Sequence, residues 1–125
     1  MFEQDYIMRL IKEMIRTILK LLFNIDSEKP TAELLENREE RLTLETFLDM
    51  VDAGNINEAE NRIFAIVDTE DKNSLGMVLL FYSYLNDKSD EFLAENNFSR
   101  KEIHDDLKYI LSQYGLDSMA ETFLT

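Results

Sequence analysis

The 125-residue chain contains no cysteine and no tryptophan, only one proline, and three glycines. Without cysteine it can form no disulfide, no thiolate zinc site and no cysteine nucleophile. This absence is typical of proteins from a reducing compartment, so we expect a cytoplasmic location. Proline and glycine are the main breakers of regular structure, and their scarcity indicates long helices joined by short polar turns.

Basic residues are also scarce relative to acidic ones. The 13 lysine and arginine residues stand against 26 aspartate and glutamate residues, which gives a formal net charge of −13. Because a field of this sign repels phosphate, we do not expect a nucleic-acid partner. Hydrophobic residues make up 45% of the chain, as in a folded globular protein. We expect one helical domain over residues 1–125 that needs no cofactor.

The first 24 residues differ from this acidic background. They carry a net charge of +1, whereas the rest of the chain carries −14. Between residues 6 and 25 the apolar positions recur at spacings of four and three, which predicts an amphipathic helix. Charged residues interrupt it too often for a membrane span, and the acidic residues near its start argue against a secretory signal.

The apolar arc of this predicted helix is unusually wide. Its central stripe contains Ile7, Ile11, Met14, Ile18, Leu21 and Ile25. Flanking residues widen the arc to roughly 200° of the wheel, about twice what a surface helix needs, so a second covering surface is required. The candidate interaction surface consists of Met8, Ile11, Ile15, Ile18, Leu19 and Leu22. Arg9, Lys12, Arg16 and Lys20 form a basic strip on the remaining side.

The rest of the chain predicts antiparallel helical hairpins over residues 31–125. The polar segment 26–30 ends in Pro30 and predicts the first connection. A further helix over residues 31–53 is expected to break near Asn37 and to end at Gly54. Residues 57–69 predict the helix that follows. We therefore expect an all-α fold of about six to seven helices, either a compact bundle or a short stack of hairpins.

Three signals place the later helices. Residues 75–85, LGMVLLFYSYL, are apolar nearly all round and predict the central buried helix. Residues 87–97 indicate a turn and a short helix. Ser99 and Glu102 match a capping box, which predicts a helix start at this point, and Phe98 with Ile103 matches a hydrophobic staple. That helix is expected to end at Gly115, before a last short helix from Asp117.

The segment GNINEA at residues 54–59 resembles the turn of a tetratricopeptide hairpin, in which a small residue ends one helix and an alanine allows close packing of the next. A shift of 34 residues falls on a second apolar hairpin, residues 75–97, that lacks both small residues. This weak match favours a generic helical bundle or an irregular stack of hairpins, and a true repeat array is the alternative. The opening residues 1–23 and the later FSRKEI block also resemble a small family of uncharacterised bacterial helical proteins. That resemblance implies a tetratricopeptide-like fold and no assigned activity.

No pattern in the sequence indicates catalysis or metal binding. The single histidine, His104, has Asp105 and Asp106 beside it, and we expect it on a solvated helix face. The acidic clusters at residues 68–71 and 87–91 lack the glycine and terminal glutamate of a calcium loop. Glycines are too dispersed for a phosphate loop. Phe81, Tyr82 and Tyr84 are expected in the core.

These observations predict a non-enzymatic module for protein–protein interaction or self-association that uses the apolar flank of the N-terminal helix. A membrane-surface anchor is the alternative, because the basic strip suits anionic headgroups. The absence of tryptophan and the acidic body argue against the membrane. A ligand site assembled from residues distant in sequence stays open at this point.

Overall fold

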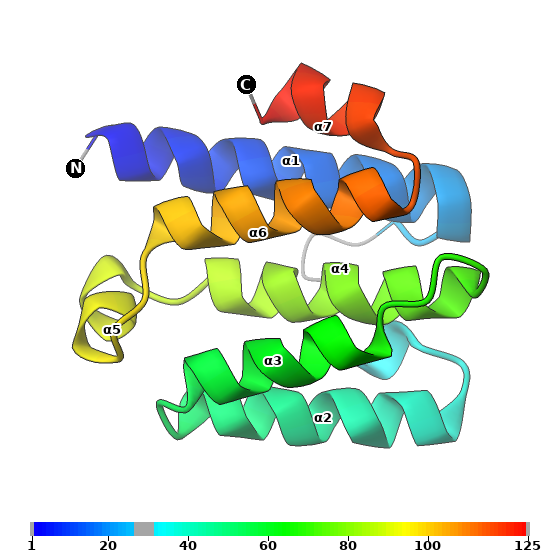
Figure 1. Ribbon diagram of the computed structural model, residues 1–125, viewed down its shortest axis with the longest axis horizontal. Coiled ribbons are helices and arrows are strands. Elements are labelled where there is room, and N and C mark those ends of the chain that lie inside the picture. The colour runs from blue at the N-terminus through cyan, green and yellow to red at the C-terminus, as the bar shows by residue number, and fades with distance from the viewer. Residues whose placement is uncertain (1, 27–31, 125) are drawn as a thin grey trace.

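A computed structural model describes residues 2–26 and 32–124, without the side chains of Phe2, Glu3 and Glu33. This part of the chain contains seven α-helices, one short 3-10 helix and no strand (Figure 1). The elements are α1 (Phe2–Phe23), the 3-10 helix η1 (Ala32–Leu34), α2 (Arg38–Asp52), α3 (Ile56–Ile66), α4 (Lys72–Asn86), α5 (Asp90–Glu95), α6 (Arg100–Gln113) and α7 (Asp117–Phe123). The predicted all-α bundle is confirmed. Most of the connection expected at residues 26–30 lies outside the described residues.

Side-chain caps fix where four of these helices begin. The side chains of Asn37, Asp71, Ser89 and Ser99 accept hydrogen bonds from backbone N–H groups in the first turns of α2, α4, α5 and α6. Such caps satisfy backbone donors that have no partner within the helix. The break near Asn37 and the start of α6 at Ser99 are thus confirmed.

Two glycines mark predicted helix ends. Gly54, with φ +88°, follows α2, and Gly115, with φ +76°, follows α6. These left-handed conformations strain residues that carry a Cβ atom, and glycine adopts them freely. At Gly54 an added Cβ would also clash with the Asn96 side chain. The turn between α2 and α3 therefore depends on glycine for both conformation and space.

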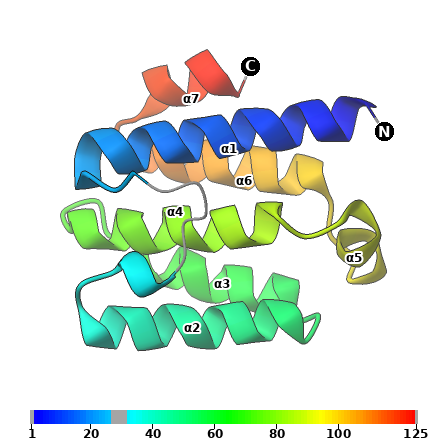
Figure 2. The same cartoon turned by 180° about the vertical axis from the view of Figure 1, so that it is seen from behind.

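Helix α4 is the centre of the bundle. Figures 1 and 2 show α4 between α1 on one side and α2 on the other, with α6 and α3 over one face of this row. Within α4 the side chains of Val78, Leu79, Leu80, Phe81 and Tyr82 are all buried. The prediction of a central buried helix at residues 75–85 is confirmed. Gly76 lets the Phe23 ring of α1 approach α4 closely.

Helix α7 lies across α1 and α6 (Figure 1). Ala120 and Leu124 at this end of the chain are buried, and Met119 and Phe123 are partly buried. Helix α7 thus packs on α1, which lies about 100 residues away in the sequence. This packing supplies the second covering surface that the wide apolar arc of α1 requires.

Candidate interaction groove between α1 and α6

The candidate interaction surface predicted on the N-terminal helix lies mostly in the core. Ile11, Ile15, Ile18 and Leu19 are buried, whereas Met8 and Leu22 are partly buried. The prediction that these six side chains form an exposed surface is therefore wrong for the four buried ones. Helices α4, α6 and α7 all pack against α1. The protein's own C-terminal helix thus supplies part of the surface that covers α1.

The direction of burial also differs from the central stripe expected for α1. Leu21, placed on that stripe, is 68% exposed, whereas Ile15 and Leu19 from the flank are buried. A periodic pattern defines an apolar arc but does not state which part of a wide arc meets a neighbour. With α4, α6 and α7 all packed on α1, the buried face includes Ile15 and Leu19 and leaves Leu21 outside.

A groove remains open between the first turns of α1 and α6. It has a volume of about 420 Å³ and is lined by Gln4, Tyr6, Ile7 and Leu10 from α1 and by Ser99, Arg100, Lys101, His104 and Asp105 from the start of α6. Tyr6 is 57% exposed, and Ile7 and Leu10 are partly buried. The groove thus has an apolar wall from α1 and a polar wall from α6.

His104 lies on the polar wall and is more covered than the sequence suggests. Its Nδ1 lies 2.9 Å from Asp105 Oδ1, and its Nε2 lies 2.7 Å from the Leu124 carbonyl oxygen. The hydrogen bond with His104 holds the pKa of the Asp105 carboxyl below its usual range. The prediction of a freely solvated histidine is wrong, because the end of the chain after α7 returns to α6 and covers the ring.

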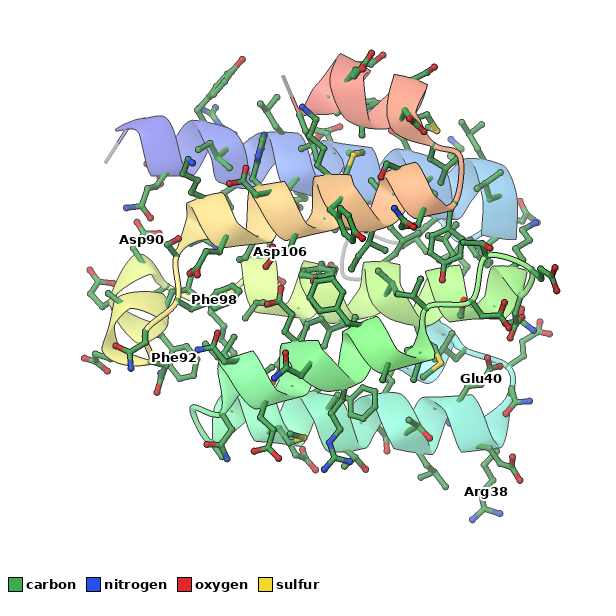
Figure 3. The ribbon with its side chains drawn as sticks, in the orientation of Figure 1. Arg38, Glu40, Asp90, Phe92, Phe98 and Asp106 are labelled. Atoms are coloured by element: carbon green, nitrogen blue, oxygen red, sulfur yellow. The ribbon has the colours of Figure 1, made fainter. Side chains whose placement is uncertain are left out.

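The buried Arg100 side chain connects the start of α6 to the end of α4 and to α5. Its guanidinium is buried and donates hydrogen bonds to the carbonyl oxygens of Asn86 and Lys88 and to Asp90 Oδ1, at 2.5, 2.9 and 2.7 Å. Figure 3 shows Asp90 where α5 approaches the start of α6. Asn86 Nδ2 in turn donates to the Met8 carbonyl oxygen of α1 at 3.0 Å. This buried network fixes the position of α1 relative to the start of α6, and therefore the positions of the two walls of the groove.

Sequence reasoning did not identify this groove. Tyr6, Ile7 and Leu10 carry a helical spacing that any amphipathic helix shows, and Lys101 carries no signal of its own. The burial of Arg100 could not be inferred either, because its partners come from the end of α4 and the loop after it. The capping box at Ser99 was the one signal that located the polar wall.

The described residues contain no group of three His, Cys, Asp or Glu side chains placed to hold a metal ion. Among them, no helix has both the length and the apolar character needed to cross a membrane. On α1 the basic residues Arg9, Lys12 and Lys20 are exposed, while the apolar face opposite them is in the core. Most of the apolar face of α1 is therefore covered by the other helices, whereas Tyr6 and Leu21 remain exposed.

No curated protein and no protein of known structure matches the chain. A family model described as a family of unknown function (DUF6483) matches residues 1–115, from the start of α1 to the glycine that follows α6. The matched region includes both walls of the groove, whereas α7 lies beyond it. Since the match spans most of the sequence, the chain belongs to this family of unknown function, DUF6483.

Proposed function

We propose that the protein is a non-enzymatic interaction module that binds a short segment of another protein in the groove between α1 and α6. The observation that carries this proposal is the exposed Tyr6 ring beside Ile7 and Leu10 in a groove of about 420 Å³. Concave sites with an apolar floor and a few polar groups are the usual form of small binding sites. Tyrosine is also among the residues that contribute most to binding energy at interfaces.

The chemistry of the two walls defines the kind of segment that fits. An apolar side chain of the partner would pack against Tyr6, Ile7 and Leu10. Lys101 is exposed on the opposite wall, at the N-terminal end of α6, and pairs with Asp105 at 3.4 Å. A carboxylate of the partner would compete with Asp105 for this ammonium group and would be stabilised by the helix N-terminus. We therefore propose a partner segment with an apolar residue next to an acidic one.

The experiment is selection of short random peptides displayed on phage against the intact chain, followed by affinity measurement with synthetic peptides from the selection. Tyr6→Ala and Leu10→Asp should each weaken binding at least about tenfold, equivalent to about 1.4 kcal/mol. Tyr109→Ala is the matched control, because Tyr109 is 60% exposed on α6 and does not line the groove. Peptides that bind all three variants equally would show that the groove is not the binding surface.

Two further measurements distinguish the proposed partner segment from a second copy of the chain and from a membrane surface. Light scattering after gel filtration should give a monomer. A dimer that Leu10→Asp dissociates would replace the partner segment with a second copy of the chain. Flotation with anionic vesicles should leave the protein unbound, because the apolar face of α1 is covered. Flotation that depends on Arg9 and Lys12 would instead support the membrane alternative.

We propose in addition that the α2–α3 hairpin is tetratricopeptide-like. Gly54 ends the turn after α2 in a left-handed conformation, and Ala59 on α3 is fully buried, as close packing of such a hairpin requires. The second copy expected at residues 75–97 is incomplete, since α5 has only six residues. The hairpin therefore occurs here without a repeat array. The bacterial origin and the cytoplasmic location stay predictions from the sequence.

A further inference from the structure

A buried carboxyl group without a cation lies between three helices, away from the groove. Glu60 on α3 is only 7% exposed, and its Oε2 accepts a hydrogen bond of 2.8 Å from the Tyr82 hydroxyl of α4. Within residues 2–26 and 32–124 no ion pair involves Glu60. A buried carboxylate without a cation is costly, so the proton is the partner that remains.

The group that shares this proton comes from α6. Asp106 lies close enough to Glu60 for hydrogen bonding between the two carboxyls to raise the Glu60 pKa, and the charge of Glu102 raises it as well. Figure 3 shows Asp106 on the edge of α6 that faces α3. Two carboxyl groups can form a hydrogen bond only when one of them carries a proton, as in the paired carboxyls of acid-base sites.

The pKa of Glu60 agrees with this arrangement. Burial raises it first, the hydrogen bond with Asp106 and the charges of Asp106 and Glu102 raise it further, and the Tyr82 hydrogen bond lowers it, which gives about 8. Burial and the Glu60 charge also raise the pKa of Tyr82, which therefore remains a neutral donor. The groups that face Glu60 are thus Tyr82 from α4 and Glu102 and Asp106 from α6.

The carboxyl pair lies where it can connect two helices that otherwise pack little on each other. Helices α3 and α6 lie side by side over the same face of α4 (Figures 1 and 2), yet they are not among the extensively packed helix pairs. Helix α3 packs chiefly on α2 and less on α4, and α2 itself packs on α4, so α3 is the part of the hairpin that lies beside α6. The carboxyl pair therefore joins the α2–α3 hairpin to α6, and α6 also carries the polar wall of the groove.

We propose that a proton shared between Glu60 and Asp106 acts as a latch that holds the α2–α3 hairpin against α6, and that loss of this proton releases the hairpin. The direction of the pH effect follows from the difference in the Glu60 pKa between the open and closed forms. The open form exposes Glu60 to water, where its pKa is near the ordinary glutamate value of 4.5, whereas the closed form holds the proton up to about pH 8. Between these values each pH unit shifts the equilibrium about tenfold toward the open form, and below them the latch is fully closed.

Hydrogen exchange of backbone amides tests the latch in the intact chain. After correction for intrinsic exchange rates, the opening constant of α3 amides should rise about tenfold per pH unit between pH 5 and 8. The α3 amides should also open at lower free energy than those of α4. If α3 and α4 amides exchange with the same opening free energy at pH 8, the hairpin opens only with the whole protein, and the latch is refuted.

Two variants and a control isolate the carboxyl pair. Glu60→Gln removes the titrating carboxyl and should make the opening constant of α3 independent of pH. Asp106→Asn leaves Glu60 buried but removes the second carboxyl, so the pH dependence should remain and end at a lower pH than in the wild type. Glu58→Gln changes the same helix at an exposed site and should keep the wild-type slope. Carbon-13 NMR of the Glu60 carboxyl gives an independent readout, and titration below pH 5 would overturn the proposal even if a variant failed to fold.

Discussion

Arg100 is the residue on which one end of the bundle depends. It is 3% exposed, and its guanidinium contacts the end of α4, the following loop and Asp90, while its Nε is buried without a partner. Removing one side of a buried ion pair leaves the other groups desolvated and unpaired. Its position in the capped first turn of α6 suggests an exposed residue. Only the approach of α4 and α5 makes it a core residue.

Replacing Arg100 by alanine should lower the free energy of unfolding by about 3 to 5 kcal/mol, because the Asn86 and Lys88 carbonyls and Asp90 lose their donor. Urea denaturation followed by circular dichroism gives this value. Arg62→Ala is the matched control, since Arg62 is exposed and pairs with Glu58 at 3.8 Å, and it should change stability by less than about 1 kcal/mol. Equal effects of the two substitutions would contradict the structural role of Arg100.

Gly54→Ala should destabilise the protein by more than about 1 kcal/mol, since alanine at φ +88° is strained and its methyl group meets Asn96. Gly115→Ala is the comparison, because Gly115 also has a positive φ but has no atom near an added Cβ. The difference between the two unfolding free energies measures the steric part alone. If it is zero, Asn96 moves aside without cost.

At the scale of elements, short-range chemistry explains where α6 begins. Ser99 accepts a hydrogen bond of 3.2 Å from the Glu102 N–H, and Phe98 and Ile103 are both buried as the predicted staple requires. These residues lie within six positions of one another. Their pattern was therefore readable from the sequence, whereas the partners of the helix faces were not.

Ser99→Ala should cost about 1 kcal/mol, because the first turn of α6 loses its cap. Thermal unfolding by calorimetry measures this loss. Ser99→Asp should restore most of it, since aspartate also caps helix N-termini. A Ser99→Ala protein with unchanged stability would show that the cap contributes nothing to α6.

The central helix α4 carries the largest expected effect among apolar substitutions. Leu80 is 1% exposed, and Leu80→Ala should lower the free energy of unfolding by about 2 to 5 kcal/mol through the cavity that it leaves. Leu42→Ala provides the control, because Leu42 is 49% exposed on α2. A loss below about 1 kcal/mol for Leu80→Ala would show that α4 is not the core.

At the scale of the whole molecule, α1 belongs to the core rather than to an attached arm. Ile11, Met14 and Ile18 are completely buried and pack with residues from the other helices in one apolar cluster. The predicted division into an N-terminal helix, 1–24, and a body, 31–125, describes the sequence pattern. Packing of α1 on α4, α6 and α7 makes this helix part of the same apolar core as the rest of the fold.

Deletion of residues 1–24 should therefore abolish cooperative unfolding, because α4, α6 and α7 would lose the helix that they cover. Thermal unfolding monitored by circular dichroism would then give a broad, gradual change in place of a sharp transition. A truncated protein that still melts sharply would indicate that α1 only docks onto a stable body. The interaction surface predicted on α1 would then become accessible again.

The sequence by itself determined the fold class, most helix ends and the central helix. Caps, left-handed glycines and periodic apolar residues act over a few positions, so Ser99, Gly54 and residues 75–85 were recognisable without coordinates. The tertiary structure decided which surfaces meet. Contacts between residues far apart in the chain decide that α7 packs on α1, that Arg100 is buried and that Asp106 lies near Glu60. A local pattern specifies an apolar or polar face but does not specify which element packs against it.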